Sequence, residues 1–453
     1  METERKLARF VARTAYEALP AAALQVARRV LLASVGTAIG GADEEGCAVL
    51  REMLAARGGK PEATVLVVGG RLPAPHAAMV NGVMCRALDY CDAMAPGVHI
   101  GSSLMPAVLA AAELIGGIDG RALMTALTVG AEVGARMNLT ERAYAGLDPT
   151  GVAGIFAATA GAARVLGLNE AQTLNALALA FNRCGGSFQS NVDGSLAVRL
   201  IQGWVAQMAL DCALLAQAGL TGPANFIEGV YGYLNLYAKG ERTVADLNAG
   251  LGEGWLLERM MFKKYPSCGL TQGGTELALR FAGGKPVAPD AVRAIEVRVP
   301  PYAHRLVGHP FTVGDNPRVN AQFSMGYCVA NAMLRGASKL AHFTPQAIDD
   351  ATVRAFIGKI GVTADAAMDA RDHTAVDLRV TLADGREEFL GLDHAPGFPD
   401  NPLSDDMHAA RFMDCLAYAH RPHPPEKGRR LIRMIEGIDT SDDVRTLINA
   451  INE

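Results

Sequence analysis

Apolar side chains recur at three- and four-residue spacing from about residue 6 to about residue 260, and Gly, Asn or Asp separates the segments. That spacing places the apolar residues on one face of an α-helix, as in "ALQVARRVLLASVGTAI" (23–39) and "AVRLIQGWVAQ" (197–207). Glycine is abundant, with 49 of 453 residues, while only 6% of the residues are aromatic. Small residues let helices approach closely, so this part of the chain predicts a large all-helical domain.

Two stretches, 103–130 and 151–180, repeat one arrangement of a small-residue helix, a glycine turn and a second helix. Asp119 and Asn169 stand where the N-cap of each second helix is expected. We expect each stretch to form an antiparallel helix pair, and such pairs to stack into the helical domain.

The pattern changes after about residue 265. Residues 294–300 alternate like a strand, and 376–392 indicate two strands around Asp384-Gly385. A helical run lies between them, and a Pro/Asp/Ser linker with Ser404 as an N-cap leads into a helical tail. The sequence therefore predicts a mainly α protein with three parts: 1–262, helical; 263–398, an inserted α+β lid; and 399–453, helices that return to the helical domain.

Composition excludes several function classes. The net charge of −5, with both signs interspersed, argues against a nucleic-acid partner. The first residues lack the apolar core of a signal peptide, and the long apolar stretches are interrupted, so no membrane span is predicted. Eight cysteines without a Cys-x-x-Cys pair indicate free thiols in the cytoplasm. Because no nucleotide-binding fingerprint, nucleophile elbow or metal-ligand spacing occurs, we expect no metal and no organic cofactor.

The stretch "RALDYCDAMAPGVHIG" (86–101) places Asp89, Asp92 and His99 between two apolar helical segments. One interpretation is a polar connection in which Asp89 caps a helix. A metal site fits less well, because the spacing matches no standard ligand set. The third interpretation is acid/base chemistry, which needs a partner supplied by the fold.

A second stretch, "MMFKKYPSCGLTQGG" (260–274), lies at the predicted junction between the domains, where ligand clefts form. It is either a solvated lysine pair, or a site in which Lys263 neutralises a substrate carboxylate beside the Cys268 thiol. A neighbouring cation would lower the pKa of that thiol.

Three further segments carry weaker candidates. Ser195 and Arg199 stand near a helix start, where free amides suit a carboxylate, although a capped helix with an extended arginine explains them equally well. Predicted loops hold Asp148, Tyr302 and His304. We predict that these residues, together with Asp92, Ser195 and Arg199, bind the substrate.

Taken together and in this order, several motifs resemble the MmgE/PrpD family, whose members include 2-methylcitrate dehydratases, cis-aconitate decarboxylases and an iminodisuccinate epimerase. The resemblance covers nearly the whole chain and rests on "NGVMCRALDYCDA", "SSLMPAVLAAAEL", "GSLAVRLIQGWVAQ", "FIEGVYG", "FKKYPSCG" and "NAQFSMGYCVANAML". It implies a large helical domain with an α+β lid, a homodimer, and site residues at the positions of Asp89, His99 and Lys263.

The sequence departs from the family pattern at four site positions. Ala93 stands for a threonine, Val198 for a lysine, Asp148 for a histidine and Cys268 for another histidine. A tyrosine of the lid corresponds to position 302 or 304. The resemblance therefore implies related chemistry on another small carboxylate.

Our main hypothesis is a cofactor-independent lyase, of the dehydratase or decarboxylase type, that acts on a small hydroxy- or poly-carboxylate by proton transfer next to a carboxylate. The expected substrate is a small di- or tricarboxylate. In this hypothesis His99 is the acid/base, Asp89 orients the imidazole, and Lys263 and Arg199 bind carboxylates. Cys268 is a second proton donor or acceptor. An epimerase on the same scaffold and a non-catalytic binding or dimerisation protein remain the alternatives.

Overall fold

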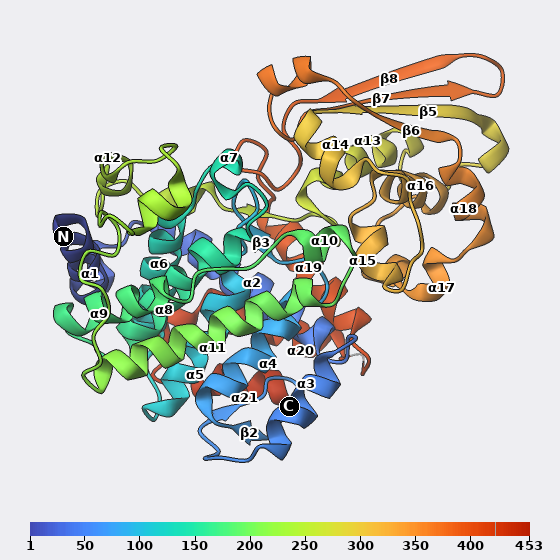
Figure 1. Cartoon of the computed structure of the whole chain (residues 1–453). Helices are drawn as coiled ribbons and strands as arrows, with labels where there is room; N and C mark the ends of the chain where they lie inside the picture. Colours follow the sequence, from blue (N-terminus) through green and yellow to red (C-terminus); the bar gives the residue numbers. More distant parts are fainter. Residues whose placement is uncertain (422) are drawn as a thin grey trace.

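The computed structural model describes residues 1–421 and 423–453. Figure 1 shows a large helical body that holds both chain ends, and a smaller body whose sheet lies at its outer edge. Each body has its own hydrophobic core, and residues 403–451 contribute to the core of the helical body. The predicted fold class, mainly α with a smaller α+β unit, is confirmed.

The helical body is built from two sets of helices. The first set is α1 (Glu2–Arg13), α2 (Ala21–Gly41), α3 (Cys47–Ala56), α4 (Ala74–Arg86), α5 (Gly101–Leu114), α6 (Gly120–Met137), α7 (Glu141–Tyr144), α8 (Ile155–Val165), α9 (Glu170–Phe181), α10 (Gln189–Val192), α11 (Ala197–Gln217) and α12 (Val244–Asn248). The second is α19 (Asp405–Tyr418), α20 (Pro425–Glu436) and α21 (Arg445–Asn452). Helices α19 and α20 pack against α2, which returns the end of the chain to this body.

Local sequence signals explain where several of these helices begin. The Asp119 carboxylate accepts from the Ala122 amide at 2.7 Å and caps α6, and the Asn169 side chain accepts from the Gln172 amide at 3.0 Å and caps α9. The Ser404 hydroxyl accepts from the Met407 amide at 3.3 Å at the start of α19. All three predicted caps are confirmed.

Glycines allow the central helices to touch. Where α4 crosses α11, a Cβ atom on Gly82 would lie 3.0 Å from the Gln202 carbonyl oxygen, and one on Gly203 would lie 2.6 Å from the Met79 carbonyl oxygen. Larger residues would force this crossing apart, so the high glycine content of the sequence has a direct structural role here.

The smaller body contains a four-stranded sheet with the order β6-β5-β7-β8. Strand β5 (Val292–Val299) runs parallel to β6 (Ile360–Ala364) and antiparallel to β7 (Val376–Leu382), which pairs with β8 (Glu387–Leu392). The β7–β8 hairpin turns at Asp384-Gly385, as predicted. The helices of this body are α13 (Gln272–Ala282), α14 (Pro301–Val307), α15 (Pro317–Gln322), α16 (Met325–Arg335), α17 (Pro345–Ile348) and α18 (Ala351–Ile357).

Short pairings complete the fold. Strands β1 (Ala63–Thr64) and β2 (Arg71–Leu72) form a small ribbon in the helical body. Strand β3 (Asp92–Ala93) pairs antiparallel with β4 (Met261–Phe262), at the point where the chain leaves the helical body. This second ribbon holds two distant segments together.

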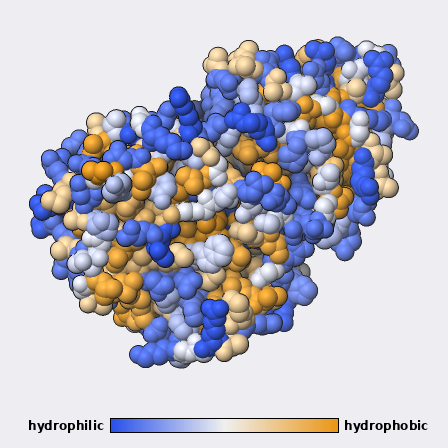
Figure 2. Space-filling view, viewed as in Figure 1, coloured by the Kyte–Doolittle hydropathy of each residue, from blue (hydrophilic) through white to orange (hydrophobic). Residues whose placement is uncertain are grey.

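Helices α2 and α11 are long and apolar enough to cross a membrane by length and composition alone. More than half of the most apolar window of each helix is buried inside the structure, at 61% and 56%. Core helices have the same composition, so this is weak evidence for a membrane span. Figure 2 shows apolar residues reaching the surface where α11 crosses the helical body, and Trp204 and Leu215 of that helix are exposed.

Candidate active site

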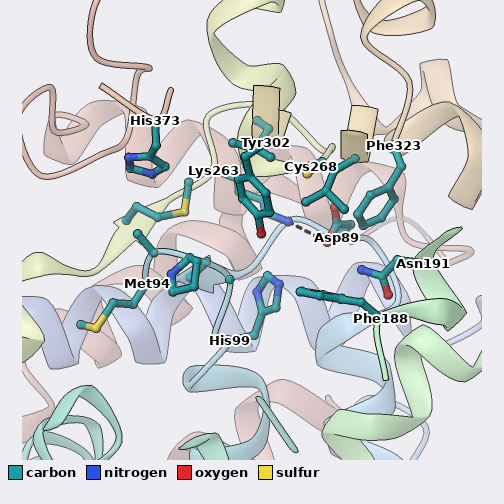
Figure 3. Close-up of a pocket in the computed structure, with 18 of the residues that line it drawn as sticks. Asp89, Met94, His99, Phe188, Asn191, Lys263, Cys268, Tyr302, Phe323 and His373 are labelled. Atoms are coloured by element: carbon teal, nitrogen blue, oxygen red, sulfur yellow. Dashed lines mark hydrogen bonds and ion pairs between the residues drawn. The ribbon is translucent and has the colours of Figure 1, made fainter. Parts of the chain in front are cut away.

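A pocket lies at the junction of the two bodies. Asp89, His99, Lys263, Cys268 and Tyr302 all line it (Figure 3). Its cavity volume is about 70 Å³, whereas a single bound water needs about 10–15 Å³. The pocket therefore suits a ligand of few non-hydrogen atoms.

Backbone contacts bring these side chains together. The β3–β4 pairing sets Asp92 opposite Phe262, which places the segment of Asp89 and His99 beside that of Lys263. Gln322, at the end of α15, then fixes both segments: its Nε2 donates to the Leu88 carbonyl at 2.7 Å and to the Pro266 carbonyl at 3.2 Å. One amide side chain of the lid thus ties the two loops of the site.

Asp89 is the centre of a buried charge cluster. Its backbone has a φ of 49°, in the left-handed region that aspartate tolerates better than most residues. Its Oδ1 accepts from Lys263 Nζ at 2.6 Å and is paired with Arg86. Burial raises the pKa of this carboxyl, but Arg86 and Lys263 outweigh it and lower the pKa to about 2. Asp89 is therefore an anion that holds two cations at the pocket.

His99 is held by the backbone rather than by Asp89, which corrects the role expected for that carboxylate. Its Nδ1 lies 2.7 Å from the carbonyl oxygen of Asp92, and its amide donates to Thr150 Oγ1 at 3.0 Å. A carbonyl only accepts, so Nδ1 carries the proton. Burial, together with Arg86 and Lys263, lowers the pKa of His99 well below 6.5. The imidazole is neutral, and its Nε2, which has no hydrogen-bond partner among the described residues, keeps a free lone pair.

Cys268 and Tyr302 are neutral proton carriers. Burial raises the pKa of Cys268 to about 11. Lys263 lowers this pKa, as expected for a nearby cation, but burial outweighs it. Burial also raises the pKa of Tyr302. Figure 3 shows the Tyr302 ring and the His99 ring pointing into the pocket from opposite sides.

The structure settles which lid residue faces the pocket. Tyr302 and His304 both lie on α14, but residues two apart on a helix point to different faces. Tyr302 lines the pocket and His304 does not.

Two predicted substrate-binding carboxylates lie outside the pocket because they bind backbone amides. Asp92 accepts from the Ile100 and Gly101 amides, at 3.1 and 2.9 Å, at the start of α5. Asp148 accepts from the Thr150 and Gly151 amides at 2.8 and 3.1 Å. Their oxygens stabilise the chain around His99, so the structure gives these side chains a positioning role.

Ser195 and Arg199 also lie away from the pocket. Helix α11 begins only at Ala197, and the Ser195 amide donates to the Ser190 carbonyl at 2.9 Å. Arg199 is buried and donates to the Glu45 carbonyl at 2.9 Å. Of the four departures from the family pattern, Ala93 and Cys268 line the pocket, whereas Asp148 and Val198 do not.

Several lining residues escaped the sequence analysis. Arg86 stands one turn before Asp89, at the end of the apolar helix α4. A charged residue at that position is the sequence signal that could have identified Arg86. Phe188 and His373 come from loops without a local pattern, and Asn191 comes from the short helix α10. The remaining lining residues are Met94, Ala95, Pro96, Gly97, Met261, Gly269, Leu270, Leu306, Phe323 and Phe398.

The set of groups defines the available chemistry. A neutral base stands beside a cation cluster, opposite two groups that can donate a proton. In the part of the chain that the structure describes, no three His, Cys, Asp or Glu side chains gather as metal ligands. The predicted absence of a cofactor, the homodimer and the cytoplasmic location stay predictions.

Comparisons with known proteins give consistent matches over most of the chain. The model of the MmgE/PrpD N-terminal domain matches residues 5–245, and that of the MmgE/PrpD C-terminal domain matches residues 265–437. Human cis-aconitate decarboxylase is 24% identical over 399 residues, covering 83% of this chain and 79% of the relative. The mouse protein of that name is 24% identical over 393 residues, covering 83% and 78%. The cis-aconitate decarboxylase-like protein oryM of Aspergillus oryzae is 25% identical over 467 aligned positions, covering 96% and 94%.

Proposed function

The chain belongs to the MmgE/PrpD family, and from this premise we propose that it is a cofactor-independent lyase that acts next to a carboxylate of a small substrate. The observation that carries the proposal is the state of His99. The imidazole is neutral, its Nδ1 is engaged with the Asp92 carbonyl, and its Nε2 is free to accept a proton. Lys263 and Arg86 supply positive charge where the substrate becomes more negative.

A dehydratase step uses these groups as follows. His99 Nε2 takes the proton from the carbon next to the carboxylate, and the C–H electron pair forms the new double bond. The neighbouring C–O bond breaks, and the hydroxyl leaves as water after receiving a proton from the Tyr302 hydroxyl or the Cys268 thiol. The imidazolium then returns a proton to that donor through solvent, which restores the starting state. One base and one acid are enough for this reaction.

Decarboxylation is the second candidate, supported by the names of the relatives. There a C–C bond breaks, carbon dioxide leaves, and its electron pair stays on the remaining carbon. Lys263 stabilises the negative charge until that carbon takes a proton from Tyr302 or Cys268, and the donor then regains a proton from solvent.

The epimerase alternative receives less support. An epimerase that works in both directions needs each of two groups to act as a base in turn. Cys268, with a pKa raised to about 11, is almost entirely a thiol near neutral pH. A thiol donates a proton but does not remove one, so the site favours a lyase.

A screen in deuterated water tests the proposal. The full-length protein is incubated with a panel of small hydroxy- and poly-carboxylates, and the products are followed by proton NMR. Dehydration gives a new vinyl signal. Decarboxylation gives a product with one deuterium on the carbon that carried the lost carboxylate. Epimerisation gives exchange at the α-carbon without loss of water or carbon dioxide. The proposal expects the first or second result, and exchange alone would contradict it.

A further inference from the structure

The charged side chains that line the pocket have a small net positive charge. Arg86 and Lys263 are cations, Asp89 is an anion that pairs with both, and His99 is neutral. The remaining ionisable ring, His373, has Nδ1 3.2 Å from the Asp372 carboxylate, so its charge when protonated is already offset. The described lining residues therefore have a net charge of about +1, which a ligand with one negative charge balances.

Lys263 can deliver this charge to a ligand. Its ammonium carries three N–H donors, and the hydrogen bonds of the described chain engage only one of them, with Asp89. The side chain is 2% exposed, so a carboxylate that reaches it leaves water. Exclusion of water strengthens that contact.

Most of the remaining lining is apolar. Met94, Phe188, Phe323 and Phe398 contribute side chains to the pocket, and Figure 3 shows the first three around the His99 and Lys263 side chains. Ala93 adds a methyl group to this lining. The Asn191 amide and the Tyr302 hydroxyl are polar, but neither carries a charge to balance a second carboxylate. An unpaired charge buried here is strongly unfavourable.

We propose that the ligand of this pocket carries a single carboxylate, bound by Lys263, and an apolar remainder that packs against Phe188 and Phe323. This narrows the proposed function, on which it rests, from small carboxylates in general to monocarboxylates with a hydrocarbon group. It departs from the di- or tricarboxylate expected from the sequence.

A neighbouring polar cavity is the alternative site for the additional carboxylates of a polycarboxylate. It shares Met94, Met261 and His373 with the pocket and contains Arg242 and Arg259. The Arg242 guanidinium already donates to the carbonyls of Asn138 and Arg136, at 2.6 and 3.3 Å. A polycarboxylate long enough to pass His373 would need Arg259, which is exposed.

Binding of unreactive probes tests the proposal without turnover. Calorimetry near neutral pH compares pentanoate with glutarate, in which a carboxylate replaces the terminal methyl group, and with propane-1,2,3-tricarboxylate. We expect pentanoate to bind about tenfold or more tightly than either of the others. The proposal is overturned if glutarate or the tricarboxylate binds as tightly as pentanoate or more tightly, or if pentanoate shows no measurable binding. In that case, weaker binding of the tricarboxylate to Arg259→Ala would show that the tricarboxylate binds in the second cavity.

Substitutions in and beside the pocket test where pentanoate binds. Lys263→Ala should weaken pentanoate binding about tenfold or more, whereas Lys264→Ala, whose ammonium pairs with Glu276 outside the pocket, should leave it unchanged. Phe188→Ala should weaken pentanoate binding and narrow its advantage over glutarate. Equal effects of Lys263→Ala and Lys264→Ala would contradict the binding mode. Because these measurements need no catalysis, His99→Ala should preserve the order of affinities even if the lyase assignment fails.

Discussion

Lys263 Nζ lies 2.6 Å from Asp89 Oδ1, although 174 positions separate the two residues in the sequence. Both side chains are almost completely buried, at 2% and 3% exposure. The pair joins the loop after α4 to the loop after β4, so the same contact sets the charge of the pocket and ties its two sides together.

Neutralising Asp89 should therefore destabilise the fold. Asp89→Asn leaves Arg86 and Lys263 as buried cations without their anion, and removing one partner of a buried pair typically costs about 3–5 kcal/mol. Denaturant unfolding measures this cost. The exposed pair of Arg354 and Asp349 provides the control, since Asp349→Asn should change stability by less than about 1 kcal/mol.

The stability that this pair contributes depends on pH. Because the folded-state pKa of Asp89 is lowered to about 2, its contribution to stability is complete above the unfolded pKa of about 3.9 and is lost as the pH falls towards 2. The difference in stability between wild type and Asp89→Asn should shrink over that interval. A difference that stays constant would contradict the assignment of charge to Asp89.

The state of His99 predicts the pH profile of the enzyme. A base must be unprotonated, and the pKa of His99 lies well below 6.5 because burial and two cations disfavour its charged form. The acidic limb of kcat/KM, which reports the free enzyme, should therefore lie below pH 6.5. A limb at or above 6.5 would show that the imidazole is not held in the environment described.

Cys268→Ser tests whether Cys268 acts as a proton donor or as a base. If Cys268 only donates a proton or lines the pocket of a lyase, the loss of turnover should be modest, because Tyr302 can also donate. If it is the second base of an epimerase, turnover should fall steeply, since a serine hydroxyl is far less acidic than a thiol. Cys212→Ser, in the buried core of α11, serves as the matched control.

Tyr302→Phe removes the second proton donor while keeping the ring. We expect kcat to fall by about 10²-fold if Tyr302 is the main acid, with a smaller effect on binding. Tyr231→Phe, at a residue that is 80% exposed, should leave kcat unchanged. Near-normal turnover of Tyr302→Phe would contradict its role as the main acid.

Local signals in the sequence predicted the fold well. Helix periodicity, the caps at Asp119 and Asn169, and the Asp384-Gly385 hairpin all depend on residues close together in the chain, and the structure confirms them. The resemblance to the family identified the chain correctly, and it named three residues that line the pocket.

The rest of the site depends on distant contacts and on burial. Asp92 and Asp148 look like substrate ligands in the sequence, but each binds backbone amides of its own neighbourhood instead: Asp148 those of Thr150 and Gly151, and Asp92 those that begin α5. The direction of the pKa shift at Cys268 depends on burial, which sequence spacing does not reveal. Phe188 and His373 reach the pocket from separate loops with no pattern of their own.

Turnover of His99→Ala on a substrate that the deuterium screen shows to be dehydrated tests the central claim most directly. A positioned histidine contributes about 10²- to 10⁴-fold to a proton transfer, so kcat should fall by that factor. The control is His309→Ala, at an exposed residue of the lid. The variant should unfold like the wild type and still bind pentanoate. A correctly folded His99→Ala protein with near-normal kcat would contradict the mechanism.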